Sequence, residues 1–264
     1  MVKEEQQHDS SLKALDILEA LKDSGPNGMG LTEVAERSGL TKSTVHRIMS
    51  ALSNRDYVVR NDETKKYKLG FKILQFNGAM IESLSVRSIA HPHLVELGRR
   101  TGETIHLVHR DGNQGVYIDK IDCQHSVGLL SYIGKRIMLH CTAAGKVFLA
   151  YMDSEQRNRI IDEVGLPQRT QHTITDRSIL EEELQKNREQ GFSWNKMEDR
   201  EDVIAISAPL FDSGNTLISA IAVAGPTYRF SQEVAMQAIP VLLETAQIVS
   251  GKLGYSANRK QPHL

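Results

Sequence analysis

The residues from 38 to 52, SGLTKSTVHRIMSAL, place a turn directly before side chains that can bind nucleic acid. A lysine and an arginine supply positive charge that attracts a phosphate backbone, and Arg47 is long enough to reach a guanine edge in the major groove. Hydroxyls in the first helical turn can donate to phosphate oxygens, beside backbone N–H groups that point outward. The contacts to DNA are therefore expected from Thr41, Lys42, Ser43, Thr44, His46 and Arg47.

A basic helix on its own is more often a solvated surface than a DNA reader, so the charge around it decides between the two. Residues 1–40 carry four basic and eight acidic side chains, whereas residues 41–70 carry seven basic and three acidic ones. The whole chain has a formal net charge of −1, which excludes a polybasic protein. Positive charge is thus concentrated in the segment that would face the duplex, and this favours DNA binding.

Apolar spacing predicts three helices and a β-hairpin around this charge. The first helix, over 10–24, carries leucines at helical spacing, namely Leu12, Leu15, Leu18 and Leu21. The second, over 31–39, is capped by Thr32 or entered from Leu31, and Thr41 caps the third. The segment 57–70 is then a charged hairpin. Three helices and a hairpin within 9–70 predict a winged helix-turn-helix, with further DNA contacts from Thr32, Lys65 and Lys66.

The remaining chain predicts a linker helix over 71–86 and an α+β domain over 87–258. Strands are expected at 103–112, 114–122 and 127–134, and a hairpin joins 203–211 to 217–225 through the turn DSGN. Helices are expected at 142–152, 153–165, 175–191 and 231–254, the last with a possible kink at Pro240. Residues 1–8 and 259–264 are expected to be a frayed terminus and a polar tail.

Bulk properties and motifs argue against several other classes of protein. The chain has no run of 18 apolar residues and begins without the apolar segment of a signal peptide, so a cytoplasmic protein without a membrane contact is expected. Cys123 and Cys141 are too few for a disulfide framework or a cysteine zinc site, and both are expected to be reduced. The stretch AAGKV lacks the first glycine and the hydroxyl residue of a phosphate-binding loop.

No catalytic or metal-binding group of residues can be assembled from spacing. His140 and Cys141 are adjacent on an extended chain and point to opposite faces, so the thiol cannot use this neighbour as a base. His106 and His109, three apart on a strand, also face opposite ways. His91 and His93 flank a proline, where capping or surface roles are expected. No pair of carboxylates among Asp119, Glu198 and Asp199 is placed in one cleft, and we expect no cofactor and no metal.

The chain resembles the IclR family of bacterial transcriptional regulators. The resemblance rests on segments in the same order along nearly the whole chain: LTKSTVHRIMSAL, YKLGFKILQFN, TGETIHLVHRDG, YIGKRIMLHCTAAGKVFLAYM, TITDRSILEEELQKNREQGFSW and IAISAPLFDSGNTLISAIAVAGP. It implies an N-terminal winged helix, a linker helix and a C-terminal effector-binding domain with a GAF-like fold. It also implies self-association as a dimer or tetramer, and binding of operator DNA and of a small carboxylate effector. TGETIHL and YIGKR are closest to regulators of sugar-acid catabolism.

The resemblance also places the effector. It implies a pocket at the turn that begins the helix after the central strands, lined by Leu129, Ile137, Thr142, Ala143, Ala144, Asn195, Ala205, Ala222 and Ala224. A helix N-terminus suits a carboxylate. Relatives that bind small keto acids have an acid, a cysteine and two serines at the last four of these positions, and Asp202 replaces a usual glycine. Smaller, less polar side chains favour a larger ligand, such as a sugar acid or an aromatic acid.

Three functions remain open at this point. The leading interpretation is a regulator, either a repressor or an activator of a catabolic operon. An enzyme acting on a small acid with an accessory DNA-binding domain is the second, and it lacks a catalytic constellation. A winged helix that contacts another protein chain is the third.

Overall fold

The computed structural model describes residues 10–76 and 85–256. The chain divides into two compact units, Met1–Ser83 and Leu84–Leu264, each of which is considered by itself. Residues 72–76 are helical, in line with the start of the expected linker helix. The rest of that helix up to residue 84, the expected frayed N-terminus at 1–8 and the expected polar tail at 259–264 lie outside the described residues.

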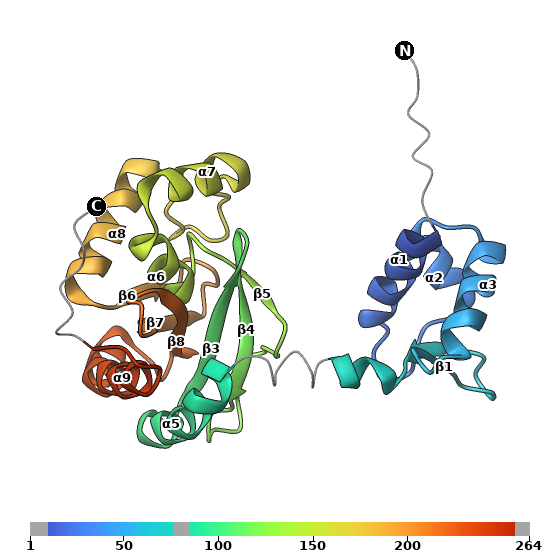
Figure 1. Cartoon of the computed structure of the whole chain (residues 1–264), viewed down its shortest axis with the longest axis horizontal. Helices are drawn as coiled ribbons and strands as arrows, with labels where there is room; N and C mark the ends of the chain where they lie inside the picture. Colours follow the sequence, from blue (N-terminus) through green and yellow to red (C-terminus); the bar gives the residue numbers. More distant parts are fainter. Residues whose placement is uncertain (1–9, 77–84, 257–264) are drawn as a thin grey trace, which may run out of the picture. The chain divides into compact units, whose positions relative to one another are not determined.

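The N-terminal unit has the element order of a winged helix-turn-helix (Figure 1). Its helices are α1 (Ser10–Lys22), α2 (Leu31–Ser38) and α3 (Lys42–Ser53), followed by the antiparallel hairpin of β1 (Val58–Arg60) and β2 (Tyr67–Leu69). Ile17, Val34, Val45 and Met49 meet in the core with no exposed surface. The buried face of α1 is thus centred on Ile17 and Leu21. Of the leucines at helical spacing, Leu12 and Leu15 are about half exposed.

Local chemistry fixes the turn between α2 and α3. Gly39 ends α2 in the left-handed conformation (φ 67°), which a residue without a Cβ adopts at little cost. Thr41 is the N-cap of α3, as predicted, and its hydroxyl accepts the Thr44 N–H at 3.4 Å. Thr32 does not cap α2, because the helix is entered at Leu31 directly after Gly30.

The C-terminal unit is built on a six-stranded sheet with the order β5-β4-β3-β8-β7-β6, in which every neighbouring pair is antiparallel. Its strands are β3 (Thr104–Asp111), β4 (Gln114–Ile121), β5 (Arg136–Met138), β6 (Ser193–Lys196), β7 (Val203–Phe211) and β8 (Leu217–Pro226). The expected strand over 127–134 is absent. That segment is an irregular connection in which Leu130 is 86% exposed, and Arg136–Met138 occupies the place beside β4 instead.

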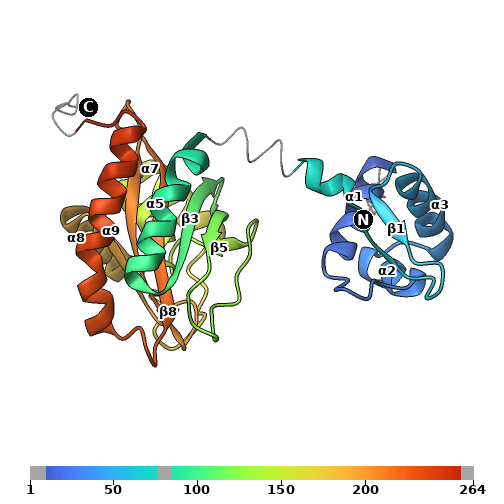
Figure 2. The same ribbon diagram turned by 90° about the horizontal axis from the view of Figure 1, so that it is seen from below.

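Helices cover both faces of this sheet (Figure 2). On one face, α5 (Ser85–Thr101) and α9 (Gln232–Lys252) lie side by side and bury Leu94, Leu97, Leu242 and Val249 against the strands. On the other face lie α6 (Ala143–Tyr151), α7 (Ser154–Val164) and α8 (Arg177–Gln190). Pro240 lies inside α9 without ending it.

Helix α9 is the one described helix that is long and apolar enough to pass for a membrane span, with a mean hydropathy of 1.2. Its buried side is occupied by Ala235, Leu242, Ala246 and Val249, which pack in the core against the sheet. Packing against the sheet therefore explains why α9 is long and apolar.

Helix α6 approaches the preceding chain so closely that Gly145 has no room for a side chain. A Cβ at this position would lie 2.5 Å from the Leu139 Cα and 2.6 Å from the Thr142 hydroxyl. Both neighbours belong to the turn that leads into α6, which cannot move without moving the start of the helix. The glycine therefore sets where α6 begins.

We predict that Gly145→Ala lowers the free energy of unfolding of the C-terminal unit by about 1–3 kcal/mol, because the added methyl overpacks a buried turn. Urea unfolding can be followed through the fluorescence of Trp194, the single tryptophan of the chain. Gly251→Ala in α9 is the matched control, since a Cβ there meets nothing within 4 Å. The control should be neutral or slightly stabilising. Equal effects of the two substitutions would contradict the close-approach argument.

Candidate functional site

The exposed face of α3 presents the side chains that the sequence predicted for DNA. Lys42, Ser43, His46 and Arg47 are exposed, while Val45, Ile48 and Met49 hold the opposite face in the core. In the part of the chain that the structure describes, no carboxylate forms an ion pair with Lys42 or Arg47. Both charges are therefore available to phosphates or bases.

The hydroxyls at the start of α3 bond to one another. Thr41 Oγ1 lies 2.9 Å from Thr44 Oγ1 and 3.2 Å from Ser43 Oγ. The cap thus takes part in fixing the helix start, and backbone N–H groups of the first turn remain directed outward. Thr32 is exposed in the first turn of α2.

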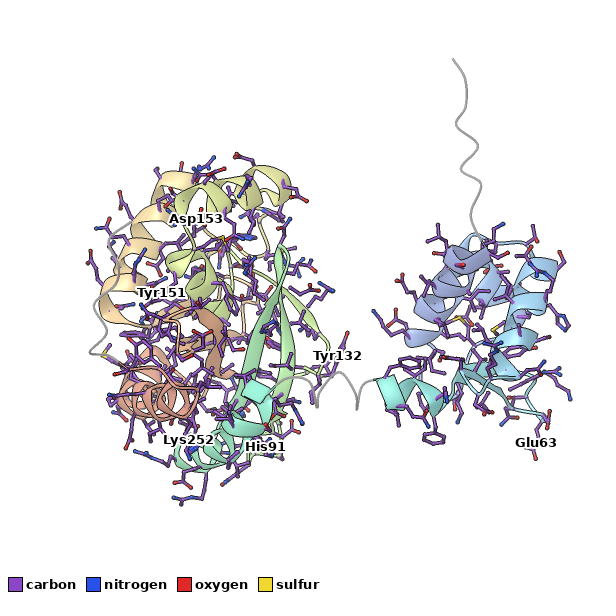
Figure 3. The ribbon with its side chains drawn as sticks, in the orientation of Figure 1. Glu63, His91, Tyr132, Tyr151, Asp153 and Lys252 are labelled. Carbon is purple, nitrogen blue, oxygen red and sulfur yellow. The ribbon has the colours of Figure 1, made fainter. Side chains whose placement is uncertain are left out.

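The hairpin is shaped as a projecting basic turn. The Asn61 side chain accepts the N–H groups of Glu63 and Thr64 at 2.9 and 2.8 Å, and Lys65 adopts a left-handed conformation (φ 56°). Lys65 and Lys66 are exposed there, and Glu63 marks the turn in Figure 3. The structure therefore places the predicted residues on two elements, α3 with its cap and the hairpin, except for Thr32, which lies on α2.

The second site is a cavity in the C-terminal unit, between the sheet and the N-terminus of α6. It encloses about 560 Å³ of empty space including its open mouth, of which about 50 Å³ admits the centre of a water molecule. The first value also counts open solvent at the mouth. The second corresponds to a few water molecules in the enclosed part, so a larger ligand must extend into the mouth.

All nine residues that the resemblance assigned to the effector line this one cavity: Leu129, Ile137, Thr142, Ala143, Ala144, Asn195, Ala205, Ala222 and Ala224. Sequence reasoning missed eight others, which are His106, Tyr117, Leu130, Ser131, Lys135, Asp199, Arg200 and Val203. Strand alternation could have found the first of these, because His106 and Ala222 are paired across β3 and β8. The loop residues carry no such periodic signal.

Polar groups converge on one end of the cavity. Thr142 is the N-cap of α6, accepting the Gly145 N–H at 3.2 Å and donating to the Met138 carbonyl at 2.6 Å. The first turn of an α-helix leaves N–H groups without partners in the helix, and Ala143 and Ala144 form that turn. Asn195 Oδ1 accepts the Glu198 N–H at 2.8 Å, which leaves the amide NH₂ as the group that can donate. This end of the cavity therefore suits an anion.

The sheet side of the cavity carries neutral hydrogen-bonding groups. His106 is buried, stacks on Tyr117 with ring centroids 4.1 Å apart, and has its Nε2 2.8 Å from the Ser131 hydroxyl. Burial, followed by the charges of Lys120 and Lys135, lowers the pKa of His106 to about 3. Burial also raises the pKa of Tyr117 to about 12. At neutral pH both side chains can exchange hydrogen bonds with hydroxyls but carry no charge.

The groups that might have formed a catalytic centre are engaged elsewhere. Cys141 is buried, and burial, together with Asp199 and Glu198, raises the pKa of its thiol to about 12, so a nucleophilic thiolate does not form near neutrality. His140 Nε2 lies 3.0 Å from the Pro167 carbonyl oxygen, and His91 Nδ1 lies 2.6 Å from Asp119 Oδ2. His91 of α5 thus pairs with the buried Asp119 of β4, and its own side chain is about half exposed, in line with a surface role rather than a cap. Across the described residues no cluster of His, Cys, Asp and Glu could hold a metal ion.

Comparison with known proteins decides the family. The model of the bacterial transcriptional regulator IclR C-terminal domain matches residues 78–251, and that of the IclR helix-turn-helix domain matches residues 10–62. The chain belongs to the IclR family. It is therefore a DNA-binding transcriptional regulator, and the predicted combination of an N-terminal helix-turn-helix with a C-terminal α+β domain is confirmed.

Relatives within the IclR family match along nearly the whole chain. The regulator KdgR of Escherichia coli K12 is 34% identical over 246 residues, which cover 93% of each protein. The DNA-binding transcriptional repressor YiaJ of the same organism is 31% identical, covering 94% of this chain and 88% of its own length. The crystal structure of the Thermotoga maritima IclR superposes with a TM-score of 0.79 at 32% identity, over 92% of this chain and 98% of that one.

The low pKa of His106 makes the stability of the C-terminal unit depend on pH. The unfolded histidine takes up a proton below pH 6.5, whereas the folded one stays neutral down to about pH 3. The stabilisation is therefore present above pH 6.5 and is lost as the pH falls toward 3. Between pH 7 and pH 5 the free energy of unfolding should therefore fall in the wild-type protein. We predict that this fall is about 2 kcal/mol smaller in the His106→Gln variant. Urea unfolding at the two pH values measures this, and parallel pH dependence in both proteins would contradict it.

Proposed function

We propose that this IclR-family regulator represses a catabolic operon and that a small carboxylate metabolite alters its affinity for the operator. The observation that carries the proposal is the anion-suited end of the cavity at the start of α6. Lys135 and Arg200 line the same cavity and add positive charge. Leu129, Ile137 and Val203 give the cavity an apolar part, which can contact the carbon skeleton of an acid whose carboxylate lies at the start of α6.

Among carboxylates, sugar acids fit this lining better than unsubstituted aromatic acids. Asp199 can accept hydrogen bonds from hydroxyls, and neutral His106, Tyr117 and Ser131 can exchange them. One relative supports this sign of regulation, since YiaJ is named a repressor. The alternative is that the protein activates the operon in response to the same ligand.

We further propose that the chain acts as a homodimer or homotetramer in the cytoplasm, and that it is not an enzyme. Operators of helix-turn-helix proteins are read as paired half-sites, which requires two copies of α3. The buried thiol of Cys141 and the neutral ring of His106 offer no activated nucleophile or base at neutral pH. An enzyme acting on a small acid would need such a group in the cavity.

DNA recognition by α3 and the hairpin is tested by gel-shift titration against the chain's own upstream region. Replacing Arg47 by Ala should cost about 1–3 kcal/mol of discrimination between operator and unrelated DNA. Lys65→Ala should instead weaken binding to all sequences equally and reduce the salt slope by about 1. Operator preference that survives Arg47→Ala would show that α3 is not the reading helix.

Effector binding is tested by thermal denaturation with D-gluconate, D-galacturonate, benzoate and 4-hydroxybenzoate. An acid present at 100 times its Kd should stabilise the folded protein by about 2.7 kcal/mol. Ala224→Leu fills the cavity and should abolish the shift. Ala220→Leu is the matched control, since Ala220 is buried on the same strand outside the cavity. Loss of the shift in the control as well would leave the cavity unsupported as the binding site.

A further inference from the structure

Lys146 is the most deeply buried charged residue described in this chain. It lies one turn inside α6, has no exposed surface, and does not line the cavity. Its Nζ donates to both oxygens of Glu198, at 2.7 and 3.0 Å, and to Glu183 Oε1 of α8 at 3.2 Å. A buried ammonium requires such partners, because desolvation of an unpaired charge is costly.

Glu198 in turn holds the segment that follows β6. Its backbone N–H donates to Asn195 Oδ1, and its carboxylate accepts the Lys196 N–H at 3.2 Å. Its carbonyl oxygen accepts the Thr173 hydroxyl at 2.6 Å. Met197, which precedes Glu198 in the chain, has a φ of 65°. A non-glycine residue keeps this left-handed conformation only where its surroundings enforce it. The ion pair with Lys146 adds two charge-assisted hydrogen bonds to these constraints.

The segment held in this way carries three of the polar groups of the cavity. Asn195, Asp199 and Arg200 all line it, whereas Lys146 and Glu198 do not. Charged pairs of this kind are poor devices for stability, since apolar residues of the same volume often serve equally well. They are better suited to fixing one geometry among several.

We propose that the Lys146–Glu198 ion pair is a positioning element that fixes Asn195, Asp199 and Arg200 at the cavity and thereby sets which hydroxylated acids the regulator accepts. The specificity part rests on the proposed function, but the positioning part does not. Helix α6 thus supplies two things: its first turn lines the cavity, and its buried lysine holds the 195–200 segment, three residues of which line the same cavity.

The test compares Lys146→Met/Glu198→Met with Glu183→Gln in the full chain. The double variant removes both charges and approximately keeps the volume, so that neither member of the pair is left as an unpaired buried charge. The control removes a carboxylate that also contacts Lys146 but belongs to α8 and does not touch the 195–200 segment. Slow hydrogen exchange of the backbone amides of β7 and β8 shows that each variant is folded.

In the absence of any added acid, hydrogen exchange of amides 195–203 should become about tenfold faster or more in the double variant and stay close to wild type in the control. Calorimetric titration should show the preference for D-gluconate over benzoate reduced about tenfold in the double variant only. Unchanged exchange in a folded double variant would overturn the proposal, as would an unchanged preference. If the wild-type protein binds neither acid, the proposed effector class fails, and the exchange measurement alone still decides whether the ion pair positions the segment.

Discussion

The start of α6 is the constraint on which the C-terminal unit depends. Gly145 allows the helix to begin against Leu139, and the Thr142 hydroxyl closes its first turn. The N–H groups of that turn lie at a cavity that is also lined by three small residues of the sheet, Ala205, Ala222 and Ala224. Elsewhere the same strands bury isoleucine, leucine and valine in close packing. Space therefore remains only where a ligand can compensate the unpaired donors.

Electrostatics gives the two ends of this space different tasks. The helix end favours an anion, and Lys135 and Arg200 add positive charge to the lining, while burial keeps His106 and Tyr117 neutral on the sheet side. A ligand with one carboxylate and several hydroxyls satisfies both ends. A second anion on the ligand would meet Asp199, which lines the same wall. The arrangement thus selects for the distribution of charge along the ligand as well as for its size.

The sequence was informative where periodicity or local chemistry dominates. The helices of the N-terminal unit, the Thr41 cap and the hairpin of β7 and β8 follow from spacing and turn residues alone. Strands as short as Arg136–Met138 have too few residues for an alternating pattern, and the apolar run before them resembled a strand although Leu130 faces solvent. The cavity came from the family resemblance rather than from any pattern, because alanines on a strand look the same in a packed core.

Strand β4 connects the cavity to the part of the chain that follows the linker segment. Tyr117 faces the cavity, and two residues further Asp119 binds Arg87 at 3.2 Å and His91 at 2.6 Å, both in the first two turns of α5. Asp119 is 1% exposed, and a buried carboxylate holds its partners firmly. Because α5 begins directly after residue 84, the strand that lines the cavity also anchors the first helix after the linker.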